Sequence, residues 1–198
     1  MFVGSTSHEK RSIMSNQESQ FVKRLYRQYC LLRRQNGDFS ADSRKISERL
    51  TAFLNESTFT CVALYWPIRG EIDLRDVSLA WLKGKKDRAL ALPFIQNGHM
   101  RFAQWGPDCI MKKGIMGINE PEQKTVVIPD LVIVPCLAMD RCGVRLGYGG
   151  GWYDRTLPKM HTFSLGVLDS EFLFDHLPRQ SQDHLLSGYL TEKELFIF

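Results

Sequence analysis

The chain has 198 residues, of which 43% are hydrophobic and 24% charged, the mix expected of one globular domain. It contains no run of about 18 apolar residues, so we expect no membrane span. The formal net charge of +4 suits an anionic small molecule and gives no argument for a nucleic-acid partner. Small molecules are the only partners that we expect, and the protein is predicted to be a monomer.

The five cysteines form no CxxC pair, which argues against a zinc site and against a disulfide framework. Reduced thiols are typical of a cytoplasmic protein, the location that we expect. Residues 1–17 are polar and lack the apolar segment of a secretory signal, so they are predicted to be a flexible lead-in. The folded domain is then residues 18–198.

Two helices are predicted first. Helical spacing begins at Glu18 and ends at Arg34, and the stripe expected to face the core is Phe21, Leu25, Tyr29 and Leu32. A different stripe of the same helix carries Lys23, Arg27, Cys30 and Arg34. Ser40 is the expected N-cap of the second helix, whose buried face is Ile46, Leu50, Phe53 and Leu54.

Strands and helices alternate through the rest of the chain. The predicted strands are 59–66, 88–93, 131–135 and 162–168, with an edge strand in the tail LFIF. Helices are predicted at 74–83 and near 152–160, and Asn97-Gly98 predicts a hairpin joining 94–96 to 99–104. Residues 105–125 are loop-rich. This alternation predicts an α/β fold with a mainly parallel sheet flanked by helices.

The segment DRCGVRLGYGGGWYDR, residues 140–155, carries five glycines between a predicted buried strand and a predicted helix. Glycine lets backbone N–H groups converge on phosphate oxygens, and Arg145 can add a charged contact. Neither a Walker loop nor the GxGxxG fingerprint fits, because no GKS or GKT follows and Trp152 takes the place of the third glycine. A tight turn without a ligand is the alternative.

This loop, RLGYGGGWYDR, resembles the signature of the 5-formyltetrahydrofolate cyclo-ligase family. Further segments agree in order over roughly residues 20–195. They are Lys23 with Arg27, Trp66-Pro67 with Glu71-Ile72-Asp73, Met100-Arg101-Phe102 with Trp105, Gly117 to Pro121, Val134 to Asp140, Leu168-Asp169, Leu177-Pro178, Asp183 and Thr191. The fold implied is a single-domain, three-layer sandwich similar to the ribose-phosphate isomerase and CoA-transferase type.

The resemblance implies an enzyme that uses ATP and Mg²⁺ to convert 5-formyltetrahydrofolate to 5,10-methenyltetrahydrofolate, ADP and phosphate. It assigns catalysis to Arg145 and Asp154. The residues implied for ATP are Lys23, Arg27, Arg145, Leu146, Gly147, Tyr148, Gly149, Gly150, Gly151, Trp152 and Tyr153. Those implied for the folate are Trp66, Glu71, Tyr148, Gly149, Gly150, Gly151 and Trp152, and the implied metal ligands are Asp154 and Asp183.

Each role has a plainer alternative. Lys23 and Arg27 could form a solvated basic face, and Tyr153 could pack in the core. Asp154 could complement the helix dipole, while Glu71 and Asp183 could be exposed loop acids. Two other functions also stay open: a catalytically silent nucleotide- or RNA-binding relative, and an ATP-dependent kinase of another small molecule.

Four positions depart from the family pattern. Cys136 stands where glycine is usual, Trp152 replaces Tyr or Phe, Leu74 stands where Thr is common, and Glu171 replaces an expected Gln. None of these changes removes a charged residue to which the resemblance assigns chemistry.

Overall fold

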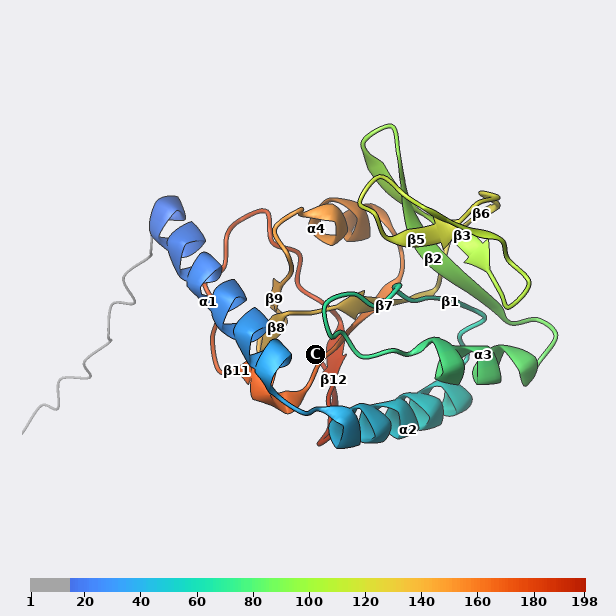
Figure 1. Ribbon diagram of the computed structural model, residues 1–198, viewed down its shortest axis with the longest axis horizontal. Coiled ribbons are helices and arrows are strands. Elements are labelled where there is room, and N and C mark those ends of the chain that lie inside the picture. The colour runs from blue at the N-terminus through green and yellow to red at the C-terminus, as the bar shows by residue number, and fades with distance from the viewer. Residues whose placement is uncertain (1–14) are drawn as a thin grey trace, which may run out of the picture.

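A computed structural model describes residues 15–198 (Figure 1). Residues 1–14 of the expected lead-in lie outside the described residues. Helix α1 (Asn16–Asn36) begins two residues before the predicted Glu18. Its first turn is fixed by a capping box, in which the Ser15 hydroxyl accepts from the Glu18 N–H at 3.2 Å and the Glu18 carboxylate accepts from the Ser15 N–H at 2.8 Å.

A mostly parallel sheet of eight strands forms the centre of the molecule, in the order β13-β12-β10-β7-β1-β2-β3-β6. The five strands from β12 to β2 run parallel, and antiparallel strands flank them. The strands are β1 (Cys61–Ala63), β2 (Ala89–Gln96), β3 (His99–Trp105), β6 (Val126–Val127), β7 (Leu131–Pro135), β10 (Phe163–Val167), β12 (Gly188–Leu190) and β13 (Leu195–Ile197).

Two small sheets lie outside the central one. The pair β4 (Met111–Lys113) and β5 (Asn119–Pro121) forms a hairpin within the predicted loop region. The other sheet joins β8 (Ala138–Asp140), β9 (Arg145–Leu146) and β11 (Leu173–Phe174). Such two- and three-residue strands give too short a pattern for sequence periodicity to detect.

Helices cover both faces of the sheet. One face packs against α2 (Ser40–Glu56) and α3 (Arg75–Lys83), and the other against α1 and α4 (Trp152–Thr156) (Figure 1). Strand β7 shows why two cores form, because successive side chains point to opposite faces. Leu131 and Ile133 belong to the core under α2, and Val132 and Val134 to the core under α1. The predicted three-layer α/β architecture is confirmed.

Several boundaries match the predictions. Strand β7 covers the predicted 131–135, and Asn97-Gly98 joins β2 to β3 with positive φ at both residues. Strand β13 lies at the edge of the sheet, as predicted for the tail. Two predictions were wrong: β1 has three residues rather than eight, and Phe39 rather than Ser40 occupies the N-cap position of α2, where it makes no side-chain hydrogen bond. The helix predicted near 152–160 consists of α4 up to Thr156 and the 3₁₀ turn Leu157–Lys159 after it.

The predicted core stripe of α1 is also wrong. Its apolar side chains are exposed to solvent: Phe21 by 52%, Leu25 by 47%, Tyr29 by 46% and Leu32 by 60%. The stripe that packs inward is instead the one with Lys23, 5% exposed, and Cys30, fully buried. Helical spacing gave the two stripes correctly, but tertiary contacts decided which of them faces inward.

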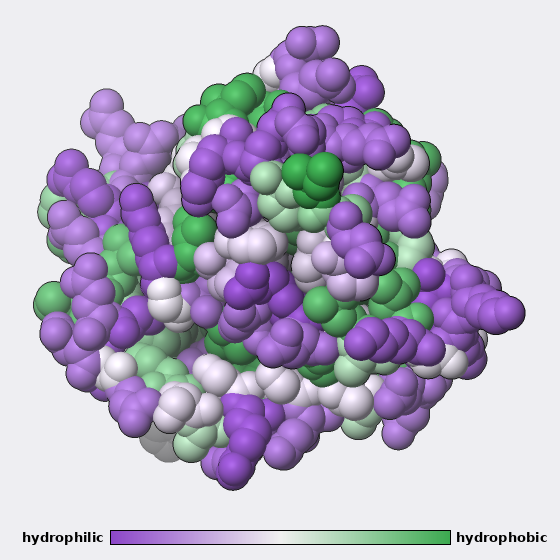
Figure 2. All heavy atoms as spheres, turned by 45° about the vertical axis from the view of Figure 1, so that its right-hand side comes forward, coloured by the Kyte–Doolittle hydropathy of each residue, from purple (hydrophilic) through white to green (hydrophobic). Residues whose placement is uncertain are grey.

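Polar side chains cover most of the face shown in Figure 2, and apolar side chains form separate patches there. Among residues 15–198, no helix is long and apolar enough to cross a membrane.

The exposure of the apolar stripe of α1 to solvent leads to a first prediction. Leu32→Ala should change the free energy of unfolding by less than about 0.5 kcal/mol, because the side chain is already in water. Leu50→Ala on α2 should cost about 2–5 kcal/mol, because that side chain is fully buried. Urea unfolding of both variants measures the difference. A cost at Leu32 equal to that at Leu50 would contradict this orientation.

Candidate active site

A cavity of about 1050 Å³ opens between α1, the glycine loop, α4 and the β4–β5 hairpin. It lies beyond the carboxyl ends of β1 and β7, where parallel sheets bind ligands. Every residue to which the resemblance assigns a role in catalysis or binding lines this one cavity: Lys23, Arg27, Trp66, Glu71, Arg145, Leu146, Gly147, Tyr148, Gly149, Gly150, Gly151, Trp152, Tyr153, Asp154 and Asp183. The structure thus brings together segments more than 150 residues apart.

The glycine loop runs from β9 to α4. Gly149 has φ of +102° and Gly151 has φ of +64°, a conformation that strains any residue with a Cβ. The backbone N–H groups of Gly149, Gly150 and Gly151 donate to no acceptor within residues 15–198. Since α4 has only five residues, its dipole adds little, and these free donors are the loop's means of holding an anion.

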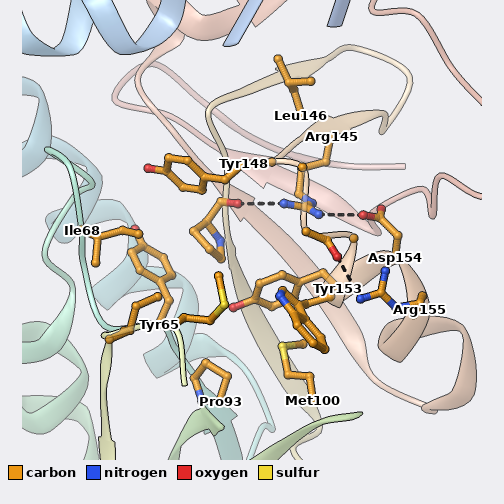
Figure 3. A pocket seen from close by; sticks show the side chains of 18 of the residues that line it. Tyr65, Ile68, Pro93, Met100, Arg145, Leu146, Tyr148, Tyr153, Asp154 and Arg155 are labelled. Carbon is orange, nitrogen blue, oxygen red and sulfur yellow. Dashed lines mark hydrogen bonds and ion pairs between the residues drawn. The ribbon is translucent and has the colours of Figure 1, made fainter. Parts of the chain in front are cut away.

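Arg145 joins the strands to the loop from inside the cavity wall. Its Nη1 donates to the carbonyl of Pro135 at the end of β7 at 3.2 Å, and its Nη2 pairs with Asp154 Oδ2 at 3.0 Å (Figure 3). Its guanidinium lies 5.2 Å from the centre of the Tyr153 ring. Its side chain is 5% exposed and that of Asp154 is 19% exposed, so this ion pair is largely shielded from water.

Two of the cations that α1 presents to the cavity, Lys23 and Arg27, have partners in other segments. The ammonium of Lys23 forms an ion pair with Asp183, whose Oδ2 also accepts from the Gln180 N–H at 2.7 Å. Arg27 Nε donates to the carbonyl of Gly147 at 2.8 Å. Burial lowers the pKa of Arg27, while Asp183 partly opposes that shift. These contacts exclude the alternative of a solvated basic face for the two residues.

Glu71 is placed on the opposite wall. Its Oε2 accepts from the Ile68 N–H at 2.9 Å, but its Oε1 is buried and has no partner within residues 15–198. The Tyr148 hydroxyl beside it is also buried and forms no hydrogen bond of good geometry there. Burial is the main cause that raises the pKa of Glu71, and it raises the pKa of Tyr148 as well. The Tyr148 hydroxyl interacts with the Glu71 carboxylate and opposes part of the rise in its pKa. Glu71 Oε1 still lacks a hydrogen bond of good geometry, which a ligand with N–H donors would supply.

The two implied metal ligands are both already paired with cations. Asp154 pairs with Arg145 and also accepts, through Oδ1, a 3.4 Å hydrogen bond from the His184 N–H, and Asp183 pairs with Lys23. Mg²⁺ prefers oxygen ligands and often takes one or two carboxylates with phosphate oxygens completing its shell. The donor set therefore suits Mg²⁺ bound together with a polyphosphate.

Sequence reasoning missed other parts of the cavity wall. Tyr65, Phe94, Met100, Ile115 and Met116 supply apolar surface, and Figure 3 shows Tyr65 and Met100 beside Tyr153. Further cations come from Arg24, Arg69 and Arg155. In all, six cationic and four acidic side chains line the cavity, so its wall is net positive. The predicted block Met100-Arg101-Phe102 was the available signal for Met100.

These features define the class: an α/β protein with a glycine loop and a cationic cavity suited to a phosphate-bearing ligand and a flat ring. The model of the 5-formyltetrahydrofolate cyclo-ligase family matches residues 8–192. The chain belongs to this family.

Individual relatives agree. A 5-formyltetrahydrofolate cyclo-ligase from Escherichia coli K12 is 28% identical over 144 residues, 68% of this chain and 79% of the relative. One from Haemophilus influenzae is 35% identical over 102 residues, 48% of this chain and only 54% of that relative's length. The solved 5,10-methenyltetrahydrofolate synthetase of Aquifex aeolicus is 32% identical, with a TM-score of 0.76 over 89% of this chain and 92% of that one.

The burial of Glu71 yields a prediction about the ligand-free protein. Folding raises the pKa of this carboxyl, so the folded protein binds the proton more tightly than the unfolded chain does. The free energy of unfolding therefore falls as the pH rises from the unfolded pKa through the folded pKa. Glu71→Gln has no such loss and keeps an acceptor for the Ile68 N–H. Thermal unfolding should therefore show the variant gaining on wild type as the pH rises from the ordinary range of a glutamate pKa through the raised pKa of the folded protein. A constant difference across that range would contradict the burial of an ionising group.

Proposed function

We propose that this chain catalyses the ATP-dependent cyclisation of 5-formyltetrahydrofolate to 5,10-methenyltetrahydrofolate, releasing ADP and phosphate. The observation that carries the proposal is that one cavity of this cyclo-ligase family member contains two features. One is a glycine loop with free N–H donors, which suits phosphate, and the other is the carboxylate of Glu71 with an unsatisfied oxygen. The two halves match the two substrates of the reaction.

The chemistry needs both halves close together. The formamide oxygen of the substrate is a poor leaving group, so it first accepts the γ-phosphoryl group of ATP while ADP leaves. N10 of the folate then attacks the activated formyl carbon, gives up its proton, and the oxygen departs with phosphate. Holding the two substrates in line removes much of the entropic barrier, and positive charge stabilises the transferring phosphoryl group.

The ATP half is assigned to α1 and the loop. Lys23 and Arg27 approach the loop from one side of α1, and the free N–H groups of the glycines face the same cavity. Arg145 lies beneath the loop, where its buried charge can stabilise negative charge that develops on the phosphoryl oxygens. In the absence of ligand, each of Lys23 and Arg145 is held by a carboxylate.

The folate half is assigned to the opposite wall. Glu71 Oε1 and the Tyr148 hydroxyl are the unsatisfied groups available to the pterin ring. Trp66 and Trp152 add flat aromatic surface, and each lies under an arginine, with Arg75 at 4.3 Å from the Trp66 ring centre and Arg155 at 4.9 Å from that of Trp152. These contacts orient the rings at the cavity edge.

Mg²⁺ fits the proposal through Asp154 and Asp183, which would hold it with the phosphate oxygens. When bound, the ion would neutralise phosphate charge and orient the γ-phosphoryl group. The chain's own contribution is to keep both carboxylates at the cavity wall and largely shielded from water, with side chains 19% and 12% exposed.

The direct test is to incubate the purified chain with 5-formyltetrahydrofolate, ATP and Mg²⁺ and to follow methenyl product by absorbance and ADP by a coupled assay. Product and ADP should appear in equal amounts. ADP formed with another small molecule but not with this folate would favour a different kinase. Folate and ATP binding without product would favour a catalytically silent relative.

Lys23→Ala should raise the KM for ATP roughly 10- to 100-fold, because a charge-assisted contact to phosphate is worth about 1.5–3 kcal/mol. The KM for the folate should change much less. Steady-state kinetics at saturating concentrations of the other substrate measure both values. Lys45→Ala, on the exposed side of α2, is the matched control. Unchanged ATP kinetics would leave Lys23 a purely structural partner of Asp183.

Asp154→Asn should lower kcat by about 100-fold or more while the protein stays folded. Asn keeps the shape but loses the charge that the metal requires, so part of the activity should return at high Mg²⁺. Asp175→Asn, whose parent side chain is 93% exposed, is the control. If kcat falls but its Mg²⁺ dependence is unchanged, the role of Asp154 is to hold Arg145 rather than the metal.

A further inference from the structure

Three carboxylates meet at the carboxyl ends of β10 and β12, outside the cavity wall. Asp42 lies in the first turn of α2, Asp169 lies two residues after β10, and Glu192 lies two residues after β12. One oxygen from each lies within 4.8 Å of the others. None of the three lines the active-site cavity.

The cluster contains a buried oxygen with no partner. Asp169 is 7% exposed and its Oδ1 caps the 3₁₀ turn Ser170–Phe172 by accepting from the Glu171 N–H at 2.8 Å. Its Oδ2 is buried and makes no hydrogen bond within residues 15–198. Burial raises the pKa of Asp169 to about 6, and the charges of Glu192 and Asp42 add to that rise. An acceptor of this kind is costly unless something compensates it.

The cations nearby do not compensate the cluster. Lys45 lies 3.7 Å from Asp42 and Lys193 lies 3.6 Å from Glu192, but their side chains are 54% and 73% exposed. Arg49 donates to the backbone carbonyl of Glu192 at 3.0 Å rather than to its carboxylate. Exposed pairs of this kind contribute little. Arg34 lines a small pocket together with Asp169 but forms no ion pair with it among residues 15–198.

We propose that Asp42, Asp169 and Glu192 form a second binding site, for a hard divalent cation, distinct from Asp154 and Asp183. Ca²⁺ binds oxygen at about 2.3–2.6 Å, so two oxygens on opposite sides of it lie about 4.8 Å apart. The three carboxylate oxygens all lie within 4.8 Å of one another, so one divalent ion can contact all three. Ca²⁺ accepts six to eight oxygens in a flexible shell, whereas Mg²⁺ demands a near-ideal octahedron, so Ca²⁺ is the less demanding probe of this site.

The bound ion would link three segments that are separate in sequence. It would join the start of α2, the end of β10 and the turn between β12 and β13. Glu192 already holds the Ser170 N–H at 2.9 Å, so one ligand is fixed to the Asp169 turn before any ion binds. The ion would therefore cross-link these three segments, and its main effect should be to raise the free energy of unfolding.

The test measures thermal unfolding of the full chain with Ca²⁺ alone, without ATP or folate. At Ca²⁺ about ten times its Kd, mass action predicts a rise in Tm of about 3–6 °C. Asp42→Asn should abolish this rise and should itself raise the Tm of the metal-free protein, because it relieves repulsion. Asp169→Asn, which keeps an acceptor for the Glu171 N–H, should also abolish the rise.

Two controls make the outcome decisive. Glu48→Gln, on α2 with its parent side chain 69% exposed, should keep the Ca²⁺ response. Asp154→Asn should keep it as well, since the proposed site does not use that residue. No Ca²⁺ response in wild type would overturn the proposal and leave the carboxylates sharing a proton. A response lost in Asp154→Asn but kept in Asp42→Asn would overturn it by placing the ion in the active-site cavity.

Discussion

The buried guanidinium of Arg145 is the contact on which the geometry of the cavity depends. It joins the end of β7, the start of β9 and the single turn of α4, and Asp154 balances its charge. Removing one partner of such a pair leaves an uncompensated buried charge, so the pair is maintained as a unit. Because the glycine loop runs between Arg145 and Asp154, their contact also fixes the two ends of that loop.

Charged side chains that reach the cavity also explain the orientation of α1. An amphipathic helix would ordinarily bury Leu25 and Leu32, but the inward stripe here carries Lys23, Arg27 and Arg34. Their polar ends find partners in the Asp183 carboxylate, the Gly147 carbonyl and the Cys136 carbonyl. Cys30 and the half-buried Tyr26 and Leu31 pack against the core between them. The helix is thus positioned by polar contacts at the cavity, and its exposed apolar stripe is the consequence.

Sequence reasoning reached the features that local chemistry determines. The short apolar run of residues 131–135 predicted β7, and Asn97-Gly98 predicted the hairpin, because both signals depend on neighbours in the chain. It could not determine which stripe of α1 faces inward, because that choice depends on partners such as Asp183, 160 residues away. The site residues were found through family resemblance. Their convergence on one cavity and the unsatisfied atoms of Glu71 and Tyr148 are visible only in three dimensions.

Most positions that depart from the family pattern lie in the scaffold around the cavity and not in the cavity wall. Cys136, Leu74 and Glu171 all lie outside the cavity wall. Glu171 pairs with Arg33 at 2.5 Å across the outer side of α1, and Leu74 is buried at the start of α3. The sulfur of Cys136 packs where a Cβ on Gly166 would come within 3.1 Å, so that glycine accommodates the larger neighbour.

Trp152 is the one departure that lines the cavity, and it replaces one aromatic ring with another. Its indole packs against Gly150, where an added Cβ would come within 2.9 Å of the ring. The larger ring is therefore compatible with the loop only because residue 150 has no side chain. Packing around the site thus accommodates the four departures from the family pattern, while the charged groups that the chemistry requires are kept.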